Sequence, residues 1–362
     1  GLGCAYNMDV KGHWITGMNN QIVWGIPHVF AIFLIVTSSG TLNIASIGSL
    51  FSQSRFKPFG RLSGLLSVCL LIGGLSILIL DLGRPDRIII AMTHYNFKSI
   101  FAWNIFLYSG FLIIISFYLW AMMEREVNHL IRLIAFLALV WRIALTSGTG
   151  LIFGFLVARE AYDSAIMAPL FIAMSLSFGL AMFVLIIKII ENISDLTFDP
   201  HIWKQIKKLL AIFLASNLYI IVIQNLTSLY ATEHHSYQKF ILIDGGWLSF
   251  LFWIGQIIIG IILPLLIIFF IKSVKLCNRL LIASILVLGG GATQLYVTII
   301  GGQSFPLILF PGKHVSSTFF DGSIPAYTPS YFEFGLGIFG FILAFKIFFI
   351  ALRILKFIPL QR

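Results

Sequence analysis

Nine long apolar segments constrain the fold of this chain more than any other feature of its sequence. Each is close to or longer than the roughly 20 residues that a helix needs to cross the hydrocarbon core of a bilayer. Membrane barrels, by contrast, use short strands of alternating polarity. The segments cover residues 22–51, 62–80, 99–123, 130–158, 163–190, 205–232, 246–271, 279–300 and 333–356. They predict an all-α polytopic membrane protein with about nine transmembrane helices.

The low content of charged residues excludes a soluble protein of this length. Charged residues make up 10% of the 362 residues, hydrophobic residues make up 59%, and the mean hydropathy is +0.98. Soluble domains carry roughly 25% charged residues, because a surface in water needs them. We therefore expect most of the surface of this chain to face lipid or other helices.

The basic residues lie in short clusters between the apolar segments. The chain has 24 Lys and Arg against 14 Asp and Glu, which gives a net charge of +10. If the chain crosses the membrane at each apolar segment, most basic residues fall on one side, in the clusters at 55–61, 125–132, 204–208, 272–279 and 353–362. Basic loops stay in the cytoplasm, so this side is predicted to be cytoplasmic. The clusters are then orientation signals, and we expect no nucleic-acid partner.

The histidines and cysteines argue against a haem or metal centre in this chain. Only His28, among eight histidines, lies well inside a predicted span, whereas a membrane cytochrome b needs paired axial histidines within its helices. Cys4, Cys69 and Cys277 have no spacing typical of iron–sulfur or zinc sites. We expect no haem, no iron–sulfur cluster and no metal ligands, so any redox function must exchange electrons with a partner.

Several polar residues map to the non-cytoplasmic half of the first four predicted helices. His28 lies about two turns into the first helix, and Asp81 closes the second helix just before a Gly-Arg-Pro break. Ionisable groups near or inside a span are costly and mark functional sites, and histidine titrates near neutral pH. Two readings stay open: proton exchange at a bound ligand, or a hydrogen-bonded interfacial His28 and a solvated ion pair of Asp81 with Arg84 or Arg87.

Other polar residues in the spans allow more than one role. Trp103 fits an aromatic belt at the membrane interface, and Asn104 should face the helix bundle. Arg142 needs a carboxylate or a water-filled pocket, while Arg159 and Asp163 have the i,i+4 spacing of an ion pair. The remaining buried amides are expected to form hydrogen bonds between helices or part of a proton path: Asn43, Asn217, Gln224, Asn225 and Gln256.

Four motifs give the chain a resemblance to a known family. They are Asp81-Leu-Gly-Arg-Pro-Asp-Arg87, Phe101-Ala-Trp-Asn104, Ala168-Pro-Leu-Phe-Ile-Ala173 and Gln294-Leu-Tyr-Val-Thr-Ile-Ile-Gly-Gly-Gln303. In this order they resemble the NrfD/PsrC family of polysulfide-reductase-type integral membrane subunits. Two further motifs make the chain most similar to the DsrP branch, the membrane subunit of a sulfur-metabolism complex: Met18-Asn-Asn-Gln-Ile-Val-Trp-Gly-Ile-Pro-His28 and Pro325-Ala-Tyr-Thr-Pro-Ser330.

The resemblance implies a core of two four-helix bundles. We place the first, with a quinone site, at residues 22–158 and the second at 159–300. A non-cytoplasmic loop at 301–332 and a peripheral helix with a cytoplasmic tail at 333–362 would follow. Residues 1–21 would form a non-cytoplasmic segment, whose apolar start is consistent with the stump of a lost helix.

The resemblance also implies a ligand and partners. Menaquinone or ubiquinone would bind in the first bundle, near its non-cytoplasmic surface. A ferredoxin-like iron–sulfur subunit would dock on that surface and exchange electrons with the quinone. Other membrane, cytochrome or iron–sulfur subunits would complete a complex in a bacterial cytoplasmic (inner) membrane.

We therefore predict a quinone/quinol-binding anchor subunit of an oxidoreductase complex of sulfur-compound metabolism, which is not catalytic alone. His28 would hydrogen-bond one quinone carbonyl, Asp81 would exchange a proton, and Arg84 would tune the charge state of Asp81. The pocket would be shaped by Asn20, Trp103 and Asn104. Two other classes stay open: an ion- or proton-translocating transporter, which prolines within the spans would suit, and a purely structural membrane anchor.

Overall fold

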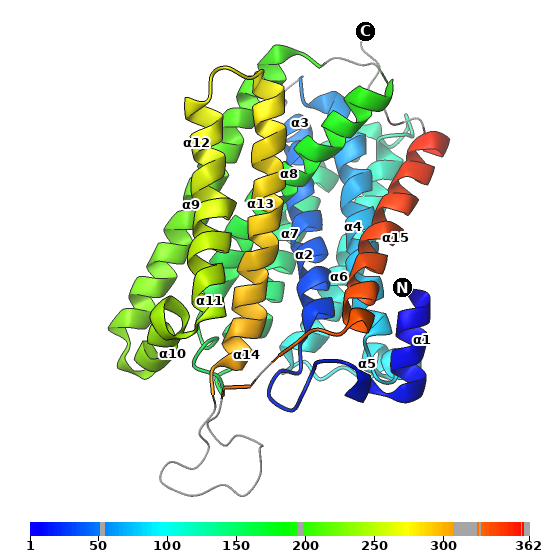
Figure 1. The fold of residues 1–362 in the computed structure, drawn as a ribbon. Coiled ribbons are helices and arrows are strands. Elements are labelled where there is room, and N and C mark those ends of the chain that lie inside the picture. The colour runs from blue at the N-terminus through cyan, green and yellow to red at the C-terminus, as the bar shows by residue number, and fades with distance from the viewer. Residues whose placement is uncertain (51–54, 195–197, 307–323, 326, 356, 358–362) are drawn as a thin grey trace, which may run out of the picture.

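The computed structural model describes residues 1–50, 55–194, 198–306, 324–325, 327–355 and 357. These residues form helices and connecting segments, and none of them belongs to a strand (Figure 1). Within this part of the chain, nine helices are long and apolar enough to cross a membrane. The predicted all-α polytopic fold is confirmed.

The nine spans follow the predicted segments, with shifts of a few residues at most ends. In chain order they are α2 (Ile26–Thr41) with α3 (Asn43–Ser49), α4 (Gly60–Leu80), α6 (Ile100–Ala121), α7 (Ile131–Gly154), α8 (Met167–Ser194), α9 (Pro200–Tyr230), α11 (Trp247–Phe250) with the π-helix η7 (Leu251–Ile262) and α12 (Leu263–Phe270), α13 (Leu276–Tyr296) with the π-helix η8 (Val297–Gly301) and α14 (Gly302–Ser304), and α15 (Tyr331–Leu355). Helix α9 begins five residues earlier than predicted. Pro200 occupies its first turn and the Asp199 side chain accepts a hydrogen bond from the His201 amide, which together fix that start.

Short helices connect the spans. They are α1 (Leu2–Lys11), η1 (His13–Ile15), η2 (Lys57–Phe59), η3 (Pro85–Arg87), α5 (Ile88–Thr93), η4 (Asn128–Leu130), η5 (Thr232–His234), α10 (His235–Lys239) and the π-helix η6 (Phe240–Asp244). The predicted loop at 301–332 is only partly described, because residues 307–323 and 326 lie outside the described residues. Its first residues, up to Ser304, continue the eighth span as helix.

Helix α2 is the central element of the molecule. It packs against α4, α7, α8, α13 and α15, and nearly all of its residues are buried. Its closest contact is with α8, where a Cβ atom added at Gly40 would lie 1.6 Å from the carbonyl oxygen of Ser175 and one added at Gly179 would lie 2.0 Å from Gly40. Small residues let two backbones touch in this way, which favours helix association in lipid.

The other helices form a group on each side of the α2–α8 contact (Figure 1). Helices α4 and α7 pack with α2, α6 packs with α7 and α4, and we call these four the N-terminal group. Helices α9, η7, α12 and α13 pack with α8 or with one another, and we call these with α8 the C-terminal group. Helix α15 packs on the outside against α2 and α4, and α1 packs against α15.

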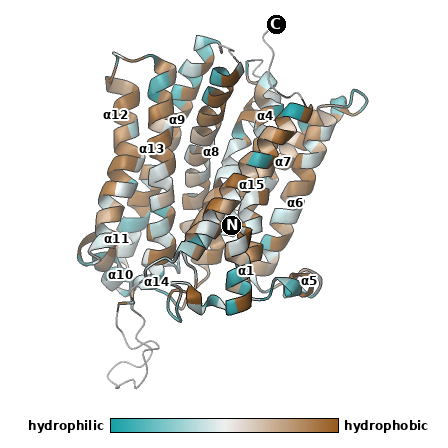
Figure 2. Cartoon of the chain, turned by 45° about the vertical axis from the view of Figure 1, so that its right-hand side comes forward, coloured by the Kyte–Doolittle hydropathy of each residue, from teal (hydrophilic) through white to brown (hydrophobic). Residues whose placement is uncertain are grey.

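One end of the molecule carries α1, α5, α10 and α14, and we call it the α5 face (Figure 1). Helix α5 lies in the connection between α4 and α6, at the end of the helix bundle (Figure 2). Its residues Ile89 and Ile90 are exposed, as they would be on a helix that rests on the headgroup region.

Candidate functional site

Asp81 lies where α4 ends, at the α5 face of the N-terminal group. Its backbone N–H still bonds to the carbonyl oxygen of Ile77, as in a regular helix, but Gly83 and Pro85 follow and the chain leaves the helical path. The side chain is not solvated: Asp81 is only 8% exposed. A carboxylate in this position needs partners, because burying an unpaired charge is costly.

Two histidines from distant parts of the chain converge on the Asp81 carboxylate. Nδ1 of His28, in the first turn of α2, lies 3.1 Å from Oδ2. Nε2 of His13, in η1, lies 3.7 Å from Oδ1 and 3.0 Å from the backbone oxygen of Asp81. These three residues form an acid–base group that we call the His–Asp–His cluster.

The cluster shifts the protonation equilibria of two of its members. Burial raises the pKa of the Asp81 carboxyl, but the contacts with His13 and His28 lower it, and the net shift is downward. The contact with Asp81 raises the pKa of His13 above its usual value, against the opposing effect of burial. Near neutral pH the arrangement therefore favours an ionised Asp81 with a proton held on the histidine side.

A cavity of about 440 Å³ lies next to His28, in the size range of small-molecule sites. Its wall is mostly apolar and comes from α2, α4, α5, α6 and α7, with Leu78, Met92 and Phe153 among the lining residues. The residues with polar atoms in the lining are Trp24, His28, Asn104, Tyr108 and Ser109. The cavity thus offers an apolar body with a few polar groups, one of which belongs to the cluster.

Asn104 and Tyr108 join α6 to α7 on one side of this cavity. The Asn104 Nδ2 group donates to the carbonyl oxygens of Ile100, at 2.9 Å, and Gly148, at 3.1 Å. The Tyr108 hydroxyl lies 3.4 Å from Oγ1 of Thr149. Both amide hydrogens of Asn104 are therefore used by the backbone, and Oδ1 has no hydrogen-bond partner among the described residues.

The structure brings together some of the predicted site residues and separates others. His28 and Asn104 line the cavity, and Asp81 lies behind His28. Arg84 is at the surface, where its Nη2 lies 3.0 Å from Oδ2 of Asp86. The partners of Asp81 are the two histidines, so the expected pair of Asp81 with Arg84 is not what the structure shows.

Asn20 and Trp103 do not line the cavity. Asn20 is exposed in the connection that precedes α2. Trp103 is 49% exposed and donates from Nε1 to the carbonyl oxygen of Phe97 at 2.9 Å. Its ring packs with Phe97 and Phe106 on the outside of α6, as in the interface belt that was the alternative role for this residue.

Sequence reasoning missed His13, Trp24 and Tyr108. Helical spacing could have indicated Tyr108, because it follows Asn104 by four residues and so shares its face. Trp24 precedes His28 by four residues, and the two rings lie 6.3 Å apart. No local signal could have placed His13, which is 68 residues from Asp81 in the chain.

A model of the family described as "Polysulphide reductase, NrfD" matches residues 14–307. The chain belongs to this family. The integral membrane subunit of an Hdr-like menaquinol oxidoreductase from Archaeoglobus fulgidus is 28% identical over 98% of this chain and 90% of that protein. A putative membrane subunit of dimethyl sulfoxide reductase from Halobacterium salinarum is 30% identical over 65% of this chain and 59% of that protein. A subunit of selenate reductase from Mesobacillus selenatarsenatis is 24% identical over 74% of this chain and 71% of that protein.

The connection between α1 and α2 carries His13 and Trp24. Gln303, in α14, and Arg159, between α7 and α8, hold this connection in place. Oε1 of Gln303 accepts hydrogen bonds from the backbone amides of Val23 and Trp24, each at 3.0 Å. Arg159 donates to the carbonyl oxygens of Gln21, at 2.7 Å, and Gln303, at 3.0 Å. The predicted ion pair of this arginine with Asp163 is wrong, because its guanidinium is turned to these carbonyls instead.

Glu333, at the start of α15, holds the same connection from the other side. Its carboxylate is fully buried and accepts hydrogen bonds from the amides of Gly17, at 2.8 Å, and Ser330, at 2.7 Å, and from the hydroxyl of Tyr327, at 2.7 Å. The Tyr327 oxygen in turn accepts from the amide of Ile26 at the start of α2. The segment that positions His13 and His28 is thus fixed by side chains from three other elements.

Among the described residues, no three His, Cys, Asp or Glu side chains are grouped so that they could hold a metal ion. The His–Asp–His cluster has three residues of these types, but they pair with one another as an acid–base group. His28 and His13 each face one carboxylate oxygen of Asp81, and His13 also contacts the backbone oxygen of Asp81.

Proposed function

We propose that this chain is the quinone/quinol-binding membrane subunit of a multi-subunit oxidoreductase complex. The observation that carries the proposal is the apolar cavity of about 440 Å³ with His28 in its wall and Asp81 behind that histidine. A quinone needs such a place: an apolar wall for the ring and tail, and a polar group near a ring oxygen. The relative named as a menaquinol oxidoreductase subunit, which aligns with nearly the whole chain, supports the same ligand class.

His28 is oriented to exchange a proton with such a ligand. Because its Nδ1 is turned to Asp81, Nε2 is the ring nitrogen left for a ligand in the cavity. When the ring proton is on Nδ1, which lies 3.1 Å from Oδ2 of Asp81, Nε2 is free to accept a hydrogen bond from a ligand hydroxyl. Quinol oxidation supplies two electrons and two protons, so a proton acceptor within hydrogen-bond reach of the ring oxygen is needed.

Asp81 and His13 would stabilise and release that proton. Oδ2 of Asp81 lies 3.1 Å from Nδ1 of His28, so a proton can pass from the histidine to the carboxylate. His13 faces the other carboxylate oxygen, Oδ1, and its side chain is 32% exposed. This histidine gives the proton a route from the buried carboxylate to the water at the α5 face. Reduction of a quinone would use the same groups in reverse.

The α5 face is where we place the partner and the non-cytoplasmic side. The cavity lies at this end of the molecule, so an iron–sulfur cluster docked there would be near the quinone. The basic clusters 125–132 and 272–279 lie at the opposite end, which is the cytoplasmic end by the positive-inside rule. A ferredoxin-like iron–sulfur subunit on the α5 face, a bacterial cytoplasmic membrane and a sulfur compound as the final substrate complete the proposal. The motifs shared with the DsrP branch support these last assignments.

The test is quinol turnover in the intact complex with His28→Gln and, as a matched control, His94→Gln. His94 is an exposed histidine at the end of α5, and its ring Nδ1 lies 3.0 Å from the hydroxyl of its neighbour Thr93. We expect the His28 variant to assemble normally and to lose about 10²-fold or more of its quinol-linked electron transfer, the usual effect of removing an acid–base group. The control should keep full activity.

Two results would contradict the proposal. Normal turnover in the His28 variant would remove this site from the mechanism. If the wild-type complex neither contains extractable quinone nor binds the fluorescent quinol analogue heptyl-hydroxyquinoline N-oxide, the chain is a structural anchor. Proton flux through the complex without any quinol would instead indicate a transporter.

A further inference from the structure

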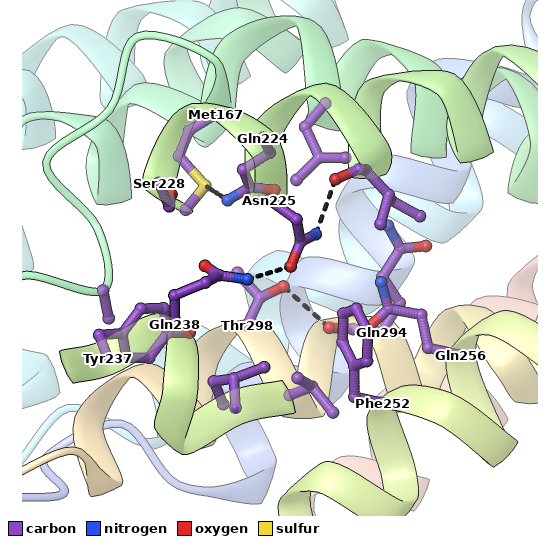
Figure 3. Close-up of a pocket in the computed structure, with 15 residues that line it drawn as sticks. Met167, Gln224, Asn225, Ser228, Tyr237, Gln238, Phe252, Gln256, Gln294 and Thr298 are labelled. Carbon is purple, nitrogen blue, oxygen red and sulfur yellow. Dashed lines mark hydrogen bonds between the residues drawn. The ribbon is translucent and has the colours of Figure 1, made fainter. Parts of the chain in front are cut away.

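A second cavity lies within the C-terminal group, between α8, α9, α10, η7 and α13 with η8 (Figure 3). It is much smaller than the first, with a volume of about 40 Å³. Five amide side chains line it, together with the hydroxyls of Ser228, Tyr237 and Thr298; the amides are Gln224, Asn225, Gln238, Gln256 and Gln294. Among the described residues that line it, none is an Asp, Glu, Lys, Arg or His.

Some of these amides already have hydrogen-bond partners (Figure 3). Gln238 donates to Oδ1 of Asn225, and Nδ2 of Asn225 donates to the carbonyl oxygen of Ile221 at 2.7 Å. At the inner end, Gln294 and Asn217 exchange hydrogen bonds of 3.0 and 3.3 Å. These bonds fix the amide groups around the cavity, so its polar wall is an ordered feature of the fold.

Other polar groups of the wall have no partner in the described part of the chain. Gln256 is 5% exposed, and its amide makes no hydrogen bond to any described residue. The hydroxyl of Tyr237 has none either, and Gln224 reaches only the sulfur of Met167, at 3.8 Å. Buried polar groups in native proteins nearly always have a partner from the protein or from ordered water. The cavity is where such a partner would lie.

Three π-helices meet at this cavity. They are η6, η7 and η8, and they contribute Ile241, Phe252 with Gln256, and Val297 with Thr298 to its wall. The π-helix is rare and occurs mainly at functional sites, because its wider turn redirects side chains from their usual helical positions. All three π-helices of the described residues therefore contribute to the wall of one small polar cavity. The unpartnered amide of Gln256 comes from the longest of the three.

We propose that this cavity binds a cluster of about three water molecules, on the basis of roughly 10–15 Å³ of cavity volume for each water. The waters donate to and accept from Gln256, Tyr237 and Gln224. They extend a hydrogen-bonded path from α10 at the α5 face to the Asn217–Gln294 pair within the span. The volume is too small for a quinone ring, and a wall without an opposite charge makes a buried ion costly. This inference does not depend on the proposed quinone site.

Hydroxyl-radical footprinting of the intact complex by short X-ray pulses in ¹⁸O-labelled water tests the proposal. Radiolysis of a bound water oxidises the side chains beside it, even where bulk solvent does not reach. Met167 in the cavity wall and Met174, two turns further along α8, are matched because they are 1% and 0% exposed. We expect severalfold faster labelling of Met167. Equal rates at the two methionines would overturn the proposal, and this comparison needs no variant.

A pair of variants then assigns the water to this cavity. Gln256→Met removes the unpartnered amide at similar volume, so labelling of Met167 should fall towards that of Met174. Gln205→Met changes an amide of α9 that is not part of the cavity wall, and it should leave the labelling unchanged. Unchanged labelling in the Gln256 variant would contradict the proposed role of this amide. Protection of Met167 on addition of Na⁺ or K⁺ would identify a cation in place of water.

Discussion

The two cavities described above differ in polarity and in the kind of chemistry that their walls allow. The cavity of the N-terminal group is large and mostly apolar, and the histidine in its wall, His28, is backed by a buried carboxylate. The cavity of the C-terminal group is small and lined by amides and hydroxyls, none of which gains or loses a proton readily near neutral pH. The more polar site is thus the less reactive one. Proton exchange needs a titratable group held in a defined state, and only the first cavity has one.

The difference also shows in how each site is built. The first site depends on the connection before α2, which contributes Trp24 to the cavity wall and His13, 68 residues from Asp81 in the chain, to the His–Asp–His cluster. Two side chains hold that connection by hydrogen bonds: Gln303, in α14 at the end of the eighth span, and Glu333, in α15. The second cavity is built within its own group of helices (Figure 1). A change in the C-terminal group can therefore reach the first site through this connection without touching a ligand.

The largest expected effect is that of Asp81→Asn. An amide of the same shape cannot accept a proton from His28, so quinol turnover should fall about 10²-fold or more. The comparison variant is Asp86→Asn, which removes the exposed partner of Arg84 and should change turnover little. Steady-state quinol oxidation by purified complexes, with their assembly checked on a native gel, measures both. If the two variants have the same turnover, the buried Asp81 is no more important for the reaction than the exposed Asp86.

A smaller and pH-dependent effect is expected for His13→Gln. The pKa of His13 is raised by Asp81, so its pairing stabilises the fold fully below the ordinary histidine pKa of about 6.5 and is lost as the pH rises through the raised value. The wild type should therefore melt at a higher temperature than the variant near pH 6, and this gap should close at alkaline pH. The pKa of Asp81 is lowered, so the gap should also close in acid, as the pH falls through that value. Turnover should fall severalfold at most, because His28 remains. A gap that widens with pH would contradict this assignment.

The fold was predictable from the sequence because each span is long enough and apolar enough to be recognised without tertiary information. His28 and Asp81 could be singled out from the sequence, since each is an ionisable residue next to a break in an apolar segment, and the structure places them together. The ion pair of Asp81 with Arg84 that their closeness in sequence suggested is not formed, because the chain leaves the helical path after α4. The backbone at Arg84 is extended, with φ −142° and ψ 73°, and the side chain points to Asp86. His13 could not be found, because its contact depends on how two distant segments pack.

Glu333→Gln tests how the connection between α1 and α2 is held in place by α15. The carboxylate accepts hydrogen bonds from Gly17, Ser330 and Tyr327, and an NH₂ group in its place would face a donor. We expect a loss of stability of roughly 1–3 kcal/mol, the usual effect of leaving such a buried group unpaired. The melting temperature of the purified protein and the KM for quinol measure the effect, with exposed Glu233→Gln as control. A lower melting temperature with an unchanged KM would show that Glu333 supports the fold and not the site.

The smallest expected effect is that of Arg84→Gln, and it distinguishes the sequence-based role of this residue from its place in the structure. If Arg84 tuned the charge of Asp81, its loss would raise the pKa of that carboxyl and shift the pH profile of quinol oxidation towards alkaline values. In the structure Arg84 is bonded to Asp86 at the surface, while His13 and His28 supply the positive charge at Asp81. Binding of the fluorescent quinol analogue and the pH profile should therefore match those of the wild type. An alkaline shift of the profile in the Arg84 variant would contradict this and would mean that the arginine reaches the cluster when the partner protein is bound.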